Sequence, residues 1–113
     1  MQSNDEKCVV VTTTLSGEEK AHDLARRLVE SRLCACVHCL PVHSTYRWRG
    51  QVETAAEYVL QCKTTRVLAD RLQQTMAELH SYEVPEITVT PILDGAPSYL
   101  AWIREETGEQ QDS

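Results

Sequence analysis

The sequence contains no phenylalanine, and it has only four glycines and four prolines among its 113 residues. So little glycine and proline argues against a disordered or fibrous chain. Without phenylalanine, the core has to be built from aliphatic side chains, and four tyrosines and two tryptophans remain as the large aromatics. A chain of this length predicts a single domain over residues 1–113, whose core needs no disulfide. We expect residues 8–104 or so to be ordered between two polar tails.

Positive charge is also scarce, since 11 lysines and arginines face 17 acidic residues and the net charge is −6. No basic stripe is present, so we expect neither a nucleic acid nor an anionic membrane surface as partner. The first residues, MQSNDEK, contain no apolar run behind a positive segment, and no stretch approaches the length of a membrane span. These absences predict a cytoplasmic protein without a signal peptide.

The five cysteines are an odd number, and cytoplasmic thiols are kept reduced, so we expect no disulfide framework. The segment LCACVHC (residues 33–39) gathers three of them with a histidine, and His43 follows. Thiols and imidazoles suit copper or zinc, but a structural zinc site usually has two C-x2-C pairs, and this segment has one. The alternative is that they are small buried hydrophobic residues. The sequence leaves the role of four cysteines open: Cys8, Cys34, Cys39 and Cys62.

The first half of the chain predicts a strand followed by a helix. The β-branched run of residues 8–14 is typical of a buried strand. Ser16 is then placed to cap a helix, with Glu19 three residues later reaching back in a capping box. The expected apolar face of that helix consists of Ala21, Leu24, Ala25, Leu28 and Val29.

Two long strands are predicted next, over residues 35–48 and 52–63, joined by a turn at Arg49–Gly50. Each arm of about 12 residues exceeds the usual strand length of about 5–6. Strand alternation places Tyr46 and Trp48 on one face near the tip. A hairpin that projects beyond its own helices leaves these aromatics bare unless another subunit covers them. Pro41 predicts that the first arm is bent or exposed.

The second half predicts a helix capped by Thr64 or Thr65, a strand over residues 87–93 that Pro91 marks as an edge or an end, and a short helix over residues 97–103. The order βαββαβ plus a C-terminal helix predicts a ferredoxin-like fold, with two helices on one face of a four-stranded antiparallel sheet. The polar tail TGEQQDS is expected to be disordered. The expected face of the middle helix consists of Leu68, Leu72, Met76 and Leu79.

The segment HSYEVPEI, residues 80–87, supports three interpretations. In the first, His80 ends a helix beside its negative pole and the proline sets an extended path into the next strand. In the second, His80 binds a metal ion together with a carboxylate or with Cys36. In the third, the segment performs acid–base chemistry through His80, Glu83 or Glu86, with Tyr82 orienting a substrate.

Five segments, RLCACV, YRWRGQVE, KTT, HSYEVPEI and YLAWI, occur in the order and context of the CutA divalent-cation-tolerance family. The resemblance covers residues 9–103. It implies a ferredoxin-like homotrimer whose assembly is shared with the PII signalling proteins, with long hairpins that pair between neighbours. It implies no enzymatic reaction. It further implies copper or another divalent cation as ligand, with His80 and Cys36 as metal-binding residues. The implied cleft between subunits gathers Tyr46, Trp48, Lys63, Tyr82, Glu86 and Trp102 around His80.

The sequence departs from the family pattern at Ser81, where a proline is usual, and at Thr13, where some members carry a cysteine. The first change predicts a looser loop, and the second puts a family metal site in doubt. We therefore expect a cytoplasmic trimeric metal-tolerance protein. The alternative is a PII-like sensor that holds a small anionic ligand at the cleft with Lys63 supplying charge. An enzyme using Glu86 and Tyr82 is less favoured, because no nucleophile–base pair or cofactor motif accompanies them.

Overall fold

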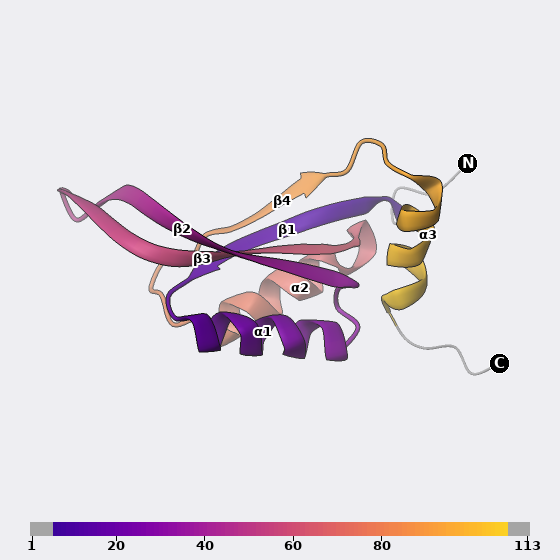
Figure 1. The fold of residues 1–113 in the computed structure, drawn as a ribbon, viewed down its shortest axis with the longest axis horizontal. Coiled ribbons are helices and arrows are strands. Elements are labelled where there is room, and N and C mark those ends of the chain that lie inside the picture. Colours follow the sequence, from indigo (N-terminus) through magenta and orange to yellow (C-terminus); the bar gives the residue numbers. More distant parts are fainter. Residues whose placement is uncertain (1–5, 109–113) are drawn as a thin grey trace.

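A computed structural model describes residues 6–108, which form one four-stranded antiparallel sheet and three helices (Figure 1). The strand order is β2-β3-β1-β4, so β1 and β3 are central and β2 and β4 are edges. The predicted βαββαβ order with a C-terminal helix is confirmed. The elements are β1 (Cys8–Leu15), α1 (Glu18–Glu30), β2 (Cys36–Trp48), β3 (Gln51–Thr65), α2 (Arg66–Leu79), β4 (Ile87–Pro91) and α3 (Pro97–Glu106).

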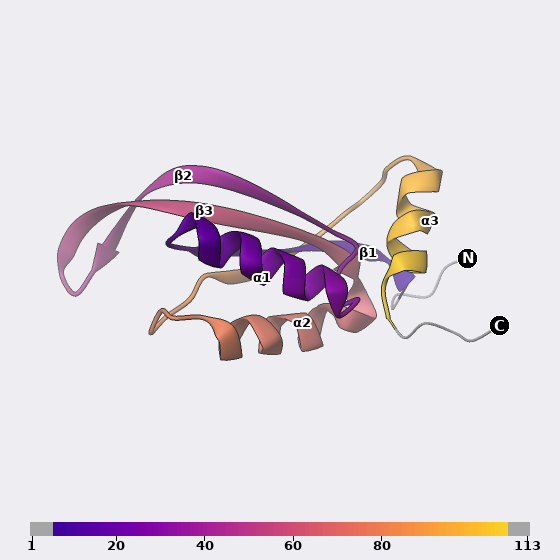
Figure 2. The same cartoon turned by 60° about the horizontal axis from the view of Figure 1, so that its bottom comes forward.

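Helices α1 and α2 cover one face of the sheet, and the main core lies between them and the strands (Figure 2). This core is aliphatic, as the absence of phenylalanine predicts. Its fully buried members include Val11, Leu28, Leu60, Leu72 and Met76. Among residues 6–108, none of the helices combines the length and apolarity needed to cross a bilayer.

The opposite face of the sheet is called the outer face here, and among the described residues α3 covers one end of it. There Ile103 packs with Cys8 and Ala35 in a second, smaller cluster. Because side chains alternate along a strand, the residues between the core positions point to the outer face. On this face Val10 and Val42 are half-buried and Leu40 is exposed. The outer face therefore leaves some apolar side chains open to solvent, among polar ones such as Gln61 and Thr88.

The β2–β3 hairpin is paired without interruption from Cys36 and Lys63 to the turn, and it projects beyond both helices (Figure 2). Arg49 and Gly50 both have positive φ angles, 49° and 80°, as a two-residue hairpin turn of type I′ requires. Pro41 is exposed on β2, and its missing N–H group costs little because β2 is an edge strand. The predicted long hairpin is confirmed.

Helix ends differ from the prediction in their details. The predicted capping box is wrong: the N-cap of α1 is Gly17 and no side chain caps the helix. Gly17 turns the chain at a φ of 92°, which moves Ser16 outside the cap position. Thr65 is the N-cap of α2 as predicted, but its hydroxyl makes no capping bond. Val29 and Leu79, expected on the apolar helix faces, are exposed, whereas Leu28, next to Val29, is buried.

All five cysteines are free thiols. Cys8, Cys34 and Cys62 are buried, which confirms the interpretation as small core residues for these three, whereas Cys36 and Cys39 are half-buried. A hydrogen bond with Cys34, followed by burial, raises the pKa of the Cys62 thiol. Burial also raises the pKa of Cys8 and of Cys39. Thiols with raised pKa values are poor nucleophiles, so these residues serve packing.

The prediction of a disordered TGEQQDS tail is wrong for its first two residues, and the other five lie outside the described residues. Thr107 is buried, and its hydroxyl donates a hydrogen bond to the carbonyl of Ile103 at 2.9 Å. The Gly108 N–H donates to the carbonyl of Arg32 at 2.9 Å, and the Arg32 Nε donates to the carbonyl of Gly108 at 2.8 Å. Arg32 also donates to the carbonyl of Glu105 at 2.9 Å, a favourable position for a cation at a helix C-terminus. Arg32 therefore joins the end of α1 to the end of α3.

These bonds predict that two truncations will differ in stability. Deleting residues 107–113 should lower the free energy of unfolding by about 2 kcal/mol more than deleting residues 109–113, because only the longer deletion removes the two bonds between Gly108 and Arg32. Urea unfolding at one fixed protein concentration measures the difference. Equal midpoints for the two truncations would contradict a structural role for Thr107 and Gly108.

Candidate functional site

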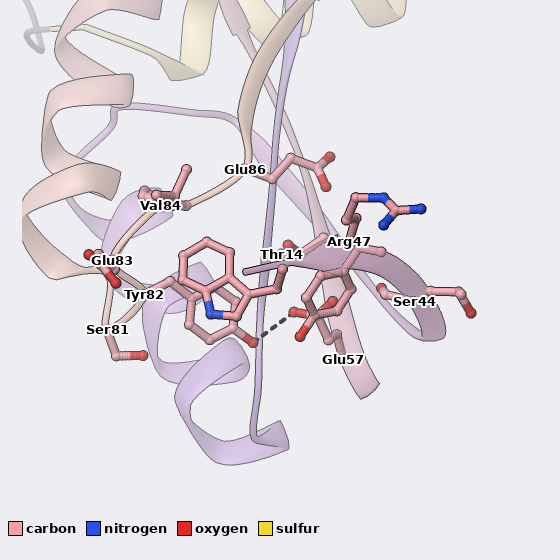
Figure 3. A pocket seen from close by; sticks show the side chains of 13 residues that line it. Thr14, Ser44, Arg47, Glu57, Ser81, Tyr82, Glu83, Val84 and Glu86 are labelled. Atoms are coloured by element: carbon pink, nitrogen blue, oxygen red, sulfur yellow. Dashed lines mark hydrogen bonds between the residues drawn. The ribbon is translucent and has the colours of Figure 1, made fainter. Parts of the chain in front are cut away.

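A pocket of about 940 Å³ lies between the β2–β3 hairpin and residues 80–86, the segment that joins α2 to β4 (Figure 3). We call this segment the 80–86 loop. The end of β1 contributes Thr14 to the wall, and β3 contributes Glu57. Four of the residues predicted for the ligand cleft line this pocket: Tyr46, Trp48, Tyr82 and Glu86.

A short hydrogen bond crosses the pocket wall from the Tyr82 hydroxyl to Oε2 of Glu57, at 2.7 Å (Figure 3). Glu57 is only 7% exposed, so this bond satisfies a carboxylate that would otherwise be costly to bury. Burial and then the bond to Glu57 raise the pKa of Tyr82, although a contact with Ser16 lowers it. The phenol therefore keeps its proton and remains a donor at neutral pH. Glu57 was not predicted; its only signal is a lone acidic residue in the strand segment TAAEYVL.

His80 holds the 80–86 loop against the sheet through both ring nitrogens. Its Nε2 lies 2.6 Å from the carbonyl oxygen of Thr14, and its Nδ1 lies 3.1 Å from the backbone nitrogen of Tyr82. Since the Tyr82 N–H must donate to Nδ1, the proton is on Nε2, which donates to Thr14. The His80 and Tyr82 rings also meet at 4.7 Å between centroids. His80 ends α2, as the first interpretation of HSYEVPEI predicts, and it also positions Tyr82.

The remaining predicted residues, Cys36, Lys63 and Trp102, do not line the pocket and lie towards the α3 end of the sheet. Cys36 pairs with Lys63, and Lys63 pairs with Val10 of β1. Thr14, the partner of His80, is four residues further along β1, which is about 13 Å at about 3.3 Å per residue. Within one chain, the predicted cleft is therefore divided between the two ends of the sheet.

At the α3 end of the sheet, Trp102 stacks on Tyr99 with 5.7 Å between ring centroids. Burial, followed by the neighbouring Cys36, raises the pKa of Tyr99. The Lys63 ammonium lies 3.1 Å from Nδ1 of His38, so this histidine contacts a lysine rather than one of the nearby cysteines. We call Cys36, Lys63 and Trp102 the α3-end group and the four cleft residues in the pocket the pocket group.

A single chain does not form the predicted copper site. His80 and Cys36 belong to opposite ends of the sheet, and both His80 nitrogens are already hydrogen-bonded. Nowhere in residues 6–108 do three or more histidine, cysteine, aspartate or glutamate side chains converge as a metal ion requires. Thr13, at the position where some relatives carry a cysteine, is fully buried, and its hydroxyl has no partner among the described residues.

The mouth of the pocket carries an ion pair that involves one of the acid–base candidates. Arg49 donates to Oε2 of Glu83 at 2.9 Å, and its guanidinium also lies 5.3 Å from the centroid of the Trp48 ring. Glu86 is exposed on the pocket wall. Glu83 and His80 thus both have structural partners, which leaves Glu86 as the acid–base candidate for which the structure describes no such bond.

Comparison with known proteins identifies the family. Residues 9–106 match the family model described as CutA1 divalent ion tolerance protein. The chain belongs to this family. It is 45% identical over 100 residues to the divalent-cation tolerance protein CutA of Thermus thermophilus, a match that covers 88% of this chain and 97% of that protein. It is 37% identical to human protein CutA over 88% of this chain, but this spans only 56% of the human protein.

Solved structures of relatives share the fold. The Thermus thermophilus protein superposes with a TM-score of 0.85 at 44% identity, covering 89% of this chain and 99% of that one. A structure from Nostoc sp. PCC 7120, described as a PII-like protein CutA in apo form, gives a TM-score of 0.84 at 36% identity, covering 88% and 97%. The resemblance read from the sequence motifs and the PII-like fold are both confirmed.

The position of His80 predicts a specific effect of removing its ring. In His80→Ala the Tyr82 amide loses its acceptor, so its hydrogen exchange should accelerate at least about fivefold, equivalent to losing about 1 kcal/mol of local protection. The matched control is His22→Ala, since His22 is exposed on α1. Amide exchange followed by NMR makes the measurement, and an unchanged rate at Tyr82 would refute the positioning role.

Proposed function

We propose that this protein acts in divalent-cation tolerance as a cytoplasmic homotrimer that binds copper or a related divalent ion between subunits. Membership of the family and the names of the relatives support the general role. One structural observation supports the assembly: the residues expected to form a single cleft are divided between the two ends of the sheet. A neighbour in head-to-tail contact would bring its α3-end group to the pocket group of this subunit.

The outer face has the composition of an interface. Leu40, Tyr46 and Trp48 are large apolar side chains on the hairpin part of this face, each 37% exposed or more. Large apolar side chains exposed on one face are a feature of surfaces that contact another protein. A head-to-tail contact between identical subunits closes into a ring when the rotation permits, and three subunits make the ring that we propose. The projecting hairpin then reaches across a neighbour, which accounts for its length.

In the proposed trimer, copper binds at the contact between subunits, with Cys36 and His80 as ligands. The Cys36 sulfur suits copper by its softness, and its half-buried side chain is more accessible than the fully buried thiols of Cys34 and Cys62. The available lone pair of His80 is on Nδ1, so the ring has to release the Tyr82 N–H to bind a metal ion there. Binding through Nε2 requires the proton to leave Nε2 and the bond to Thr14 to break. Metal binding therefore competes with the anchoring of the 80–86 loop, and it should weaken on acidification because protons compete for the same ligand atoms.

A second candidate function is that of a PII-like sensor that holds a small ligand in the cleft between subunits. The description of the Nostoc structure as a PII-like protein supports it. So does Lys63, whose ammonium lies on the outer face and would supply charge to an anionic ligand.

Copper titration by calorimetry, in a buffer without imidazole, tests the metal proposal. His80→Ala and Cys36→Ser should each weaken binding at least about tenfold, and their combination should be less than additive because both hold one ion. The controls are His22→Ala and Cys39→Ser, which change the same residue types elsewhere. Unchanged copper affinity in both test variants would exclude this site and favour the sensor.

A further inference from the structure

The lining of the pocket combines aromatic rings with carboxylates, three of each among its 13 residues. Among the lining residues only Arg47 is basic. Figure 3 shows its guanidinium directed away from the hydrogen bond between Tyr82 and Glu57. The side chains that give the pocket its character are Tyr46, Trp48 and Tyr82 as aromatics, and Glu57, Glu83 and Glu86 as carboxylates.

Glu57 gives this pocket a buried acceptor with capacity to spare. Its side chain is 7% exposed, and Oε2 accepts the Tyr82 hydrogen bond. Among the described residues, no second group donates to the carboxylate. A carboxylate has about four acceptor positions, and the Tyr82 hydroxyl fills one of them. The remaining positions can accept from a donor or a cation that enters the pocket.

The chain already uses this recognition chemistry at the pocket mouth. The Arg49 guanidinium lies between the Trp48 ring, 5.3 Å away, and the Glu83 carboxylate, 2.9 Å away. The guanidinium is a planar organic cation. It is held by a ring of the hairpin, Trp48, and by a carboxylate of the 80–86 loop, Glu83. Arg49 is largely exposed, with 72% of its side chain accessible, and does not fill the interior where Glu57 lies.

A bare metal ion does not fit this lining. Across the part of the chain that the structure describes, no three acidic, histidine or cysteine side chains converge closely enough to hold one. The carboxylates are spread over a pocket of about 940 Å³. This arrangement suits a larger organic cation, whose charged group and hydrocarbon part contact different walls of the pocket. Aromatic faces attract such cations through their quadrupoles and also bury their apolar parts.

We propose that the pocket binds an organic ammonium ion, with Glu57 accepting its charge and the rings of Tyr46, Trp48 and Tyr82 enclosing its hydrocarbon part. This deepens the proposed function, because it names a ligand class for the cleft, and it rests on that function only for the pocket being accessible in the assembled protein. It differs from the sensor alternative in the sign of the ligand charge.

Three probes of similar shape and different charge test the proposal by calorimetry on the assembled full-length protein. They are phenethylammonium, phenethyl alcohol and phenylacetate, which carry positive, zero and negative charge. The ammonium probe should bind at least about tenfold more tightly than the alcohol, and phenylacetate should bind most weakly. Equal affinity for the ammonium and the alcohol, no binding of the ammonium, or preference for phenylacetate would each overturn the proposal.

Substitutions of single residues test whether the ammonium probe binds in the pocket. Glu57→Gln keeps an acceptor for Tyr82 and should weaken the ammonium probe about tenfold, whereas Glu53→Gln removes the same charge from β3 outside the pocket and should leave it unchanged. If circular dichroism shows that Glu57→Gln is misfolded, Glu86→Gln, on the exposed wall, replaces it with an expected severalfold loss. Arg49→Asn, which suits the turn, should tighten binding severalfold by freeing Trp48 and Glu83.

Equal affinities for the parent and both pocket variants would place the ammonium elsewhere and refute the inference. Copper titration of the same samples separates this result from the proposed function. A protein that binds copper through Cys36 and ignores the ammonium probe would refute only the ligand class, whereas ammonium binding without copper binding would refute only the metal role.

Discussion

Two helices can cover only one face of a four-stranded sheet, and most features of this protein depend on what that leaves uncovered. Helices α1 and α2 bury the aliphatic side chains on their face, while α3 covers only one end of the outer face. The uncovered strands carry Val10, Leu40 and Val42 with the aromatic residues of the hairpin. Exposed apolar area of this kind is costly in water, and in the assembly that we propose a second copy of the chain would remove that cost. Assembly would therefore also affect the pocket, because Tyr46, Trp48 and Glu57 of the outer face line it.

The pocket itself depends on a short chain of local anchors. His80 ties the 80–86 loop to the end of β1 and holds the Tyr82 amide, and Tyr82 in turn satisfies the buried carboxylate of Glu57. Each bond fixes the group that makes the next, so the loop forms a wall without secondary structure of its own. The histidine that the family resemblance offers as a metal ligand is therefore already used in the single chain. In the function that we propose, a metal ion and the loop would compete for it.

The sequence predicts the elements well because hydrophobic periodicity and turn residues act locally. Arg49–Gly50 forms the hairpin turn as predicted, and β4 is an edge strand that ends at Pro91, two residues before the predicted end of that strand. The capping box failed because a positive φ at Gly17 competes with it, a backbone choice that residue types alone do not decide. The tail prediction failed at Thr107 because polar composition says nothing about a distant arginine that binds the backbone.

The site was less predictable because its contacts are distant in sequence. Four cleft residues were identified through the family motifs, but the burial of Glu57 follows from the packing of the 80–86 loop onto β3. The two bonds of His80 likewise require the loop to return to Thr14, 66 residues earlier. Periodicity gives the face on which a side chain lies, whereas its partner on that face depends on how the strands and loops are assembled.

The mass of the protein in solution tests the central claim, that the outer face is covered by neighbouring copies. Light scattering at micromolar concentration should give three times the 12.8 kDa mass of the chain. Trp48→Arg, on the outer face, should lower this mass, whereas Glu78→Arg, exposed on α2, should not. A parent protein with the mass of a single chain would contradict the account.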